Sequence, residues 1–175
     1  MRYYRLRVNE GKSAVASPTK RKFLGYSFYY KNGTYRLRVH PKSLNRLKDK
    51  VREVTNRNVS MNFETRLKKL IEKTRGWVNY FKLADMSKSL KEMDGWIRRR
   101  LRACIWKTWK KIRTRFTSLN KLGIDRNKAW EFANTRKGYW RISNSPIMQR
   151  SITNERLEKR GYVSMSTMYK KVILA

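Results

Sequence analysis

Apolar and polar residues alternate along the chain between Phe23 and His40. A period of two is the pattern of a strand with one buried face. Two such runs flank Asn32 and Gly33, a pair that favours a two-residue type I′ turn because both positions need positive φ. The pattern therefore predicts an antiparallel β-hairpin. Its turn would place Tyr30 opposite Tyr35, Phe28 opposite Leu37, and Tyr26 opposite Val39.

Three helices are predicted after the hairpin, because apolar residues recur every three or four positions. Pro41 suits the first turn of a helix, and Asn62 or Ser60 can cap the second helix after a polar break at 56–62. Ser87 is expected to cap the third helix, and Gly76 in the second predicts the close approach of another helix. The residues predicted to face inward are Leu44, Leu47, Val51 and Val54, then Phe63, Leu67, Leu70, Ile71, Thr74, Val78 and Phe81, then Leu90, Met93, Ile97, Leu101, Cys104 and Ile105.

Beyond Trp106 the periodicity is weaker, and shorter elements are predicted. Residues 107–116 favour a strongly basic helix, 119–125 form a turn, and a short helix runs from 125 or 126 to 134. Gly138 and Pro146 bracket a segment predicted to be extended, and a helix at 153–158 ends at Gly161. The fold class is therefore mainly α with a β-hairpin. A three-helix bundle follows the hairpin, and a small, basic, mostly helical region follows the bundle.

The charge of the chain extends this picture from fold to function. Lys and Arg number 45 against 12 Asp and Glu, so the formal net charge is +33 on 175 residues. Self-repulsion at this density opposes a compact state, and a polyanionic partner would offset it. Aromatic residues make up 13% of the chain, which is too many for a disordered basic tail. The composition therefore predicts a folded protein that binds nucleic acid.

Several kinds of site are excluded or disfavoured by the residues available. With one cysteine, Cys104, and one histidine, His40, the chain cannot form a disulfide framework or a four-ligand Cys/His zinc site. No apolar run reaches the roughly 18 residues that span a bilayer, and the first residues lack the apolar core of a signal peptide. We therefore expect a cytoplasmic protein without membrane contact. No nucleophilic triad, Gly-rich phosphate loop or carboxylate pair is found, so we expect the chain to be non-catalytic.

The densest charge lies in the third predicted helix and the segment after it. On a helix of 3.6 residues per turn these cations cannot share one face, so they would wrap around the exposed side. A solvated face is the ordinary alternative, but the scarcity of acidic partners favours contacts with RNA phosphates. The residues of this run are Arg98, Arg99, Arg100, Arg102, Lys107, Lys110, Lys111, Arg113 and Arg115.

Aromatic residues among these charges are candidates for stacking on unpaired bases. Core packing explains Trp106 and Trp109 at least as well, whereas Trp140, in a predicted loop, is open to both interpretations. Two other basic groups are predicted to contact nucleic acid. One consists of Arg136, Lys137 and Arg141 around Trp140. The other consists of Lys20, Arg21 and Lys22 before the hairpin, and these side chains could equally lie in solvent.

Several short motifs occur in a fixed order along the chain. They are KFLGYSF at 22–28, RGWVNYF at 75–81, WIRRRLR at 96–102 and ANTRKGYWRISNSP at 133–146, with Thr153-Asn154 and Gly161-Tyr162 later. Over roughly residues 6–172 this set resembles the thumb (maturase, or X) domain and the following D region of the bacterial group II intron-encoded reverse transcriptases, or maturases.

The resemblance implies an order of domains. Residues 1–20 would be a remnant of the reverse-transcriptase palm, 21–105 the hairpin and three-helix thumb, and 106–175 a D-like nucleic-acid-binding region. In this family the Tyr-x-Asp-Asp loop lies upstream of the matching residues. Two-metal polymerisation needs clustered carboxylates, but the first aspartate of this chain is Asp49 and Glu10 is the only acidic residue before it. We therefore expect a C-terminal portion without polymerase or endonuclease activity. It would need no cofactor of its own, because Mg²⁺ would belong to the missing palm and to the intron RNA.

The function favoured by the resemblance is that of an RNA-binding maturase unit in a ribonucleoprotein. It would stabilise folded group II intron RNA for splicing, and hold RNA–DNA template–primer and target DNA. Recognition by shape and phosphate suits structured RNA, whose base edges lie in a deep groove. One alternative is a subunit of a split reverse transcriptase, with a separate palm or finger domain docking on residues 1–40. Another is a non-specific basic RNA chaperone, which would bind any RNA with similar affinity.

Overall fold

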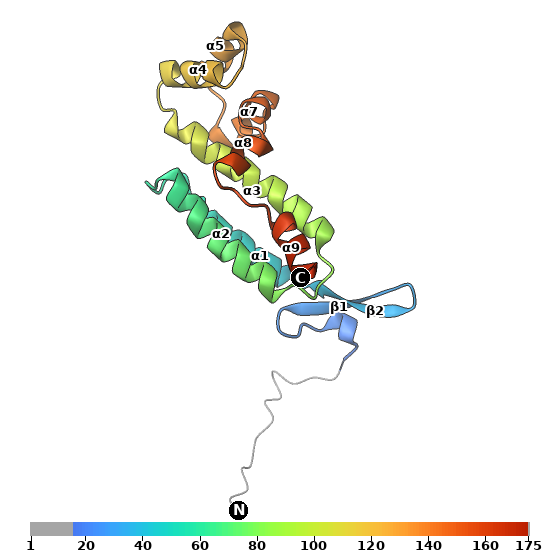
Figure 1. Cartoon of the computed structure of the whole chain (residues 1–175). Coiled ribbons are helices and arrows are strands. Elements are labelled where there is room, and N and C mark those ends of the chain that lie inside the picture. The colour runs from blue at the N-terminus through green and yellow to red at the C-terminus, as the bar shows by residue number, and fades with distance from the viewer. Residues whose placement is uncertain (1–15, 175) are drawn as a thin grey trace, which may run out of the picture.

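The structure is a computed structural model that describes residues 16–174. Within this range the chain is mainly helical with a two-stranded antiparallel sheet, so the predicted fold class is confirmed. Figure 1 shows the long helix α3 through the molecule, the hairpin at one end and α4 with α5 at the other. The elements are η1 (Pro18–Lys20), β1 (Tyr26–Lys31), β2 (Thr34–Val39), α1 (Pro41–Val54), α2 (Phe63–Tyr80), α3 (Ser87–Thr108), α4 (Ile112–Lys121), α5 (Arg126–Ala133), α6 (Tyr139–Ile142), α7 (Pro146–Ser151), α8 (Asn154–Lys159) and α9 (Met165–Ile173).

The hairpin of β1 and β2 forms as its alternating pattern predicts. The strands pair in the predicted register, with Phe28 opposite Leu37. At the turn, Asn32 and Gly33 have φ values of +51° and +77°, which are the positive values that a type I′ turn requires. The turn therefore sets which face of the hairpin is aromatic and aliphatic.

Gly25 lets the base of the hairpin contact the helices. Its φ is +88°, and a Cβ at this position would lie 2.9 Å from Cζ of Phe81. The Gly25 carbonyl accepts hydrogen bonds from the His40 backbone N–H (2.9 Å) and from the Ser43 hydroxyl (3.0 Å). A larger residue here would push the hairpin away from α1 and α2.

Polar side chains begin two of the three bundle helices. Nδ1 of His40 accepts a hydrogen bond from the backbone N–H of Lys42 at the start of α1, and Asn62 caps α2 in the same way. The predicted cap of α3 by Ser87 is wrong, because Ser87 is the first helical residue and makes no capping bond. Met86 precedes it and is 2% exposed, so burial of an apolar side chain positions the start of this helix.

One continuous apolar core runs from β2 through the bundle to α9. The residues predicted to face inward are buried or, for Leu44, Phe63 and Ile71, partly buried. The expected close approach of a helix to Gly76 is wrong. A Cβ at this position would meet nothing within 4 Å, because Gly76 lies on the exposed side of α2.

The region after α3 departs from prediction in two places. The basic helix predicted at 107–116 is interrupted, because the backbone leaves helical geometry at Trp109 before α4 begins. The segment from Gly138 to Pro146 is not extended either. It forms the short helix α6, whose Ile142 side chain is 1% exposed in the core. The predicted turn at 119–125 is confirmed only after residue 121, because α4 continues to Lys121. The helices predicted at 125–134 and 153–158 are confirmed as α5 and α8.

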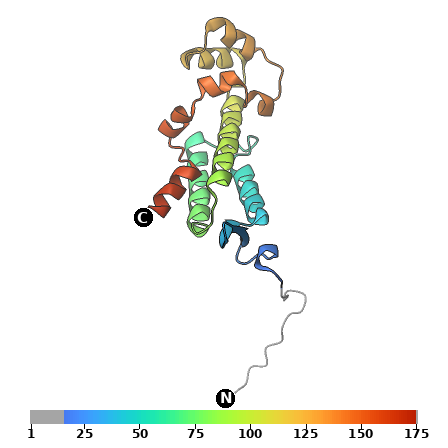
Figure 2. The same ribbon diagram turned by 90° about the vertical axis from the view of Figure 1, so that its right-hand side faces the viewer.

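The last described helix, α9, returns along the chain to pack on α2 and α3 (Figures 1 and 2). Asp94 of α3 fixes this return with a carboxylate that is almost fully buried. It accepts hydrogen bonds from the Tyr162 hydroxyl (3.1 Å), from the backbone N–H groups of Met165 (2.8 Å) and Ser166 (3.0 Å), and from the Ser166 hydroxyl (2.6 Å). Burial, and then the Asp94 charge, raise the pKa of Tyr162, so this residue stays a donor.

The predicted thumb (21–105) and D-like region (106–175) are joined through α3 and α9. The predicted boundary between residues 105 and 106 lies inside α3, and α9 of the second part packs on helices of the first. Of the predicted palm remnant at 1–20, residues 1–15 lie outside the described residues, and the rest contains η1. The division into domains stays a prediction.

Candidate nucleic-acid interface

Most of the cations have no acidic partner in the part of the chain that the structure describes. Four ion pairs form there, each between side chains that are partly exposed to solvent. None of them involves the arginines of α3 or the lysines that follow. An uncompensated positive surface of this kind attracts polyanions. The pairs are Arg36–Asp85, Arg52–Asp49, Lys73–Glu53 and Arg160–Glu64.

The four arginines predicted on the third helix have different environments. Arg102 is 8% exposed and donates hydrogen bonds to the Ile152 carbonyl (2.8 Å) and to Oδ1 of Asn154 (3.1 Å). Burial, and then Arg98, lower the pKa of Arg102. Its guanidinium therefore joins α3 to the start of α8, and it is poorly placed to reach a ligand at the surface.

Arg99 and Arg100 contact different tryptophans. The Arg99 guanidinium lies 3.8 Å from the centroid of the Trp140 ring and donates to the Trp140 carbonyl (2.9 Å). The Arg100 guanidinium donates to Oγ1 of Thr55 and lies 5.2 Å from the centroid of the Trp96 ring. Both side chains are half-buried, so each presents part of a guanidinium to solvent.

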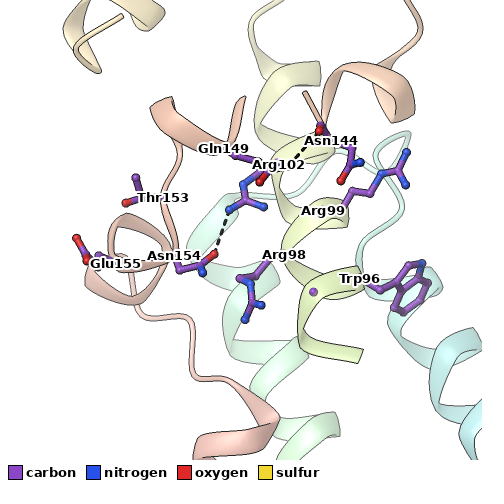
Figure 3. A pocket seen from close by; sticks show the side chains of 10 residues that line it. Trp96, Arg98, Arg99, Arg102, Asn144, Gln149, Thr153, Asn154 and Glu155 are labelled. Atoms are coloured by element: carbon purple, nitrogen blue, oxygen red, sulfur yellow. Dashed lines mark hydrogen bonds between the residues drawn. The ribbon is translucent and has the colours of Figure 1, made fainter. Parts of the chain in front are cut away.

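A cleft of about 640 Å³ separates α3 from α8 and its neighbours, and we call it the α3–α8 cleft (Figure 3). Arg98 of α3 points into the space below the Arg102–Asn154 hydrogen bond, and Glu155 contributes a carboxylate. Three guanidiniums against one carboxylate give the cleft a positive charge, which suits an anion. It is lined by Gly95, Trp96, Arg98, Arg99, Arg102, Asn144, Gln149, Thr153, Asn154 and Glu155.

A smaller cleft of about 230 Å³ lies between the loop after α1, helix α3 and helix α6, and we call it the Trp140 cleft. Beside it, the Tyr139 ring lies within reach of two cations, 5.3 Å from the Arg57 guanidinium and 5.0 Å from Nζ of Lys107. Cation–π contacts of this kind hold α6 against α3 without a carboxylate. The lining residues are Thr55, Asn56, Arg57, Asn58, Arg100, Ala103 and Trp140.

The other predicted contacts fall into two surface groups. One consists of exposed cations that lie between the end of α3 and α6 along the chain, beginning with Lys110 and Lys111. Lys20, Arg21 and Lys22 are also exposed, but they lie beside the hairpin at the opposite end of the molecule (Figure 1). The structure therefore does not bring all predicted contacts together. The exposed cations of the first group are Lys110, Lys111, Arg113, Arg136, Lys137 and Arg141.

The tryptophans divide between core and surface. Trp106 is 1% exposed and belongs to the core, and Trp109 packs edge-to-face on it with 5.6 Å between ring centroids. Trp109 also lines an apolar groove with Ile105 and Leu122. Of the three candidates for base stacking, Trp140 has the most accessible ring, with 37% of the residue exposed.

Sequence reasoning missed the loop after α1 as part of a site. The polar pattern of residues 56–58, Asn-Arg-Asn, predicts only a break between helices. Arg57 reaches Tyr139, which is more than 80 positions later in the chain, so no local pattern pairs them. The sequence signal for this part of the site is an arginine between two asparagines. Their side chains together offer hydrogen-bond donors and acceptors to bases and phosphates.

These features define a class of protein: a basic, mainly helical domain whose surface cations gather around aromatic side chains. Within residues 16–174, no group of three His, Cys, Asp or Glu is arranged to hold a metal ion, and no helix could span a membrane.

Residues 44–123 match the family model described as the group II intron, maturase-specific domain. The chain therefore carries this domain, and the resemblance inferred from its motifs is confirmed. The match supports a maturase role in group II intron splicing. The matched range begins inside α1 and ends after α4, at the turn containing Gly123. A search of curated proteins found no match to the chain.

Proposed function

We propose that this chain binds group II intron RNA and stabilises its folded form for splicing. The observation that supports the proposal most directly is the grouping of unpaired cations from α3 to α6, beside the two basic clefts. Phosphates of a folded RNA would neutralise these cations, and the released counterions would favour binding. The basic group beside the hairpin is a second proposed contact, for template–primer or target DNA.

We further infer that the chain acts by binding and does not catalyse a reaction itself. Binding energy that is available only from the folded RNA shifts its folding equilibrium towards the active form. The intron RNA and its Mg²⁺ would then supply the chemistry of splicing. The chain would work within a ribonucleoprotein, and it would need no cofactor of its own.

The experiment that tests this function compares a group II intron RNA with an unrelated structured RNA of equal length. Binding is measured between about 50 and 200 mM salt, where phosphate contacts weaken steeply. We expect a preference for the intron that persists at the higher salt. Equal affinity for both RNAs would contradict the proposal and favour a non-specific RNA chaperone.

A pair of variants with equal charge tests where the RNA binds. In the first variant Lys110, Lys111 and Arg113 become Gln, and in the second Lys82, Lys88 and Lys91, at the other end of α3, become Gln. The first should lower the salt slope by about two to three, since each lost phosphate contact contributes about 0.7–0.9. If both variants lower the slope equally, the charge acts without a defined surface.

A further inference from the structure

The Trp140 cleft combines an accessible aromatic ring with guanidiniums and amides in a small space. We propose that it binds one unpaired nucleotide of the RNA, with its base on the Trp140 ring and its phosphate beside Arg57 and Arg100. This inference rests on the proposed function, because it names the feature of the RNA that the surface recognises. The other basic surfaces would contact phosphates of paired regions, which carry no such feature.

The aromatic part of the site is held in position by Arg99. The guanidinium of Arg99 lies 3.8 Å from the centroid of the Trp140 ring and also donates to the Trp140 carbonyl at 2.9 Å. The ring is therefore fixed through one face, while 37% of the residue stays exposed. A preorganised ring loses little conformational freedom when a base stacks on it, and such stacking accepts any base.

The charge of the cleft suits one phosphate. Its lining contains two guanidiniums and no carboxylate. Arg57 makes no hydrogen bond or ion pair with residues 16–174, and Arg100 is half-buried, with no carboxylate paired to it in that range. Burial, and then the charges of Arg52 and Arg57, lower the pKa of Arg100. A phosphate placed between Arg57 and Arg100 would relieve this repulsion.

The size and amides of the cleft suit a single base. Its volume of about 230 Å³ is below the roughly 300–1,000 Å³ of pockets for drug-sized ligands. Asn56 and Asn58 each bring an amide, and Oδ1 of Asn56 already accepts a hydrogen bond from the Asn58 backbone N–H. Amides can pair with the exposed edge of an unpaired base, whereas a duplex hides its edges in a deep groove.

The test uses a fully paired RNA hairpin and the same hairpin with one 2-aminopurine bulged from its stem. Fluorescence anisotropy measures the two affinities, and the quenching of 2-aminopurine reports stacking. We expect tighter binding of the bulged hairpin and a quenched signal. Trp140→Leu should weaken binding of the bulged hairpin roughly 5- to 150-fold, the range that stacking of one base provides. Trp140→Phe should restore most of this loss.

Trp130→Leu is the matched control, because Trp130 is 57% exposed on α5 and does not line the cleft. It should leave both affinities unchanged, and circular dichroism checks that each variant is folded. Equal binding of the two hairpins, or quenching that survives Trp140→Leu, would overturn the inference. Either result leaves the proposed function intact if the intron RNA is still preferred, so the two failures are distinguishable.

Discussion

Arginine has two roles at the scale of single residues in this protein. Arg66 and Arg102 are buried, and their guanidiniums donate to the backbone carbonyls of Val54 and Ile152. Arg57 and Arg98 line clefts, where a ligand can reach them. Sequence alone does not separate these roles, because the acceptors of Arg102 lie about 50 positions later in the chain. The run of arginines on α3 was predictable, but the inward direction of Arg102 was not.

Arg66→Met tests the structural role of arginine. Arg66 is 4% exposed, and it donates to the carbonyls of Val54, Asn56 and Val59 in the loop after α1. Loss of these bonds leaves the buried Val54 carbonyl without its Arg66 donor, so we expect the free energy of unfolding to fall by about 1–3 kcal/mol. Urea denaturation measures this change. Lys68→Met, an exposed change on the same helix, should alter it by less than about 0.5 kcal/mol.

His40 should make the stability of the fold depend on pH. Burial, followed by the charges of Lys22, Lys42 and Arg38, lowers the pKa of His40 in the folded state. The unfolded chain therefore binds the proton first, so this stability is complete above about pH 6.5 and declines as the pH falls towards the folded pKa. His40→Asn keeps the cap of α1 without titrating in this range.

The melting temperature at about pH 7.5 and about pH 5.5 measures this dependence, in a range where ordinary carboxylates stay ionised. The wild-type protein should lose more stability on acidification than the His40→Asn variant. Equal losses in the two proteins would show that His40 does not cause the dependence.

At the scale of elements, local signals and distant contacts determine different parts of the structure. The hairpin and the helices α1, α2, α5 and α8 begin and end at turn or capping residues, so the sequence predicted them. The break at Trp109 and the helix α6 depend on which side chains are buried against the finished bundle. Trp109 packs on Trp106, and Ile142 enters the core. Periodicity is too short in these segments to reveal such contacts.

Asp94→Asn tests how α9 is attached to the bundle. The Asp94 carboxylate accepts four hydrogen bonds, two of them at Oδ2 from Ser166. An amide can keep only one oxygen, so at least one buried donor would face another donor. We expect the free energy of unfolding to fall by about 1–3 kcal/mol.

Hydrogen exchange should show the loss of protection first in α9. Glu92→Gln is the matched control, since Glu92 is an exposed acid on the same helix. If Asp94→Asn and Glu92→Gln have equal effects on exchange in α9, the hydrogen bonds of Asp94 do not attach this helix.

At the scale of the whole molecule, the net charge of +33 gives salt two opposite effects. Salt screens repulsion among the cations, so the melting temperature of the free protein should rise between about 50 and 200 mM salt. Over the same range the affinity for RNA should fall. Differential scanning fluorimetry with and without RNA measures both trends. A melting temperature of the free protein that falls with salt would contradict this account.

The attachment of α9 also sets the order in which the molecule can be completed during synthesis. Asp94 finds its partners 68 to 72 positions later in the chain. At about 5–20 residues per second, a nascent chain needs roughly 4–14 s to add that length. During this interval the carboxylate has no partner from α9, and α2 and α3 lack the helix that covers them. An intron transcript that meets the nascent protein would therefore encounter a bundle that α9 does not yet cover, although every residue of the Trp140 cleft would already have been synthesised.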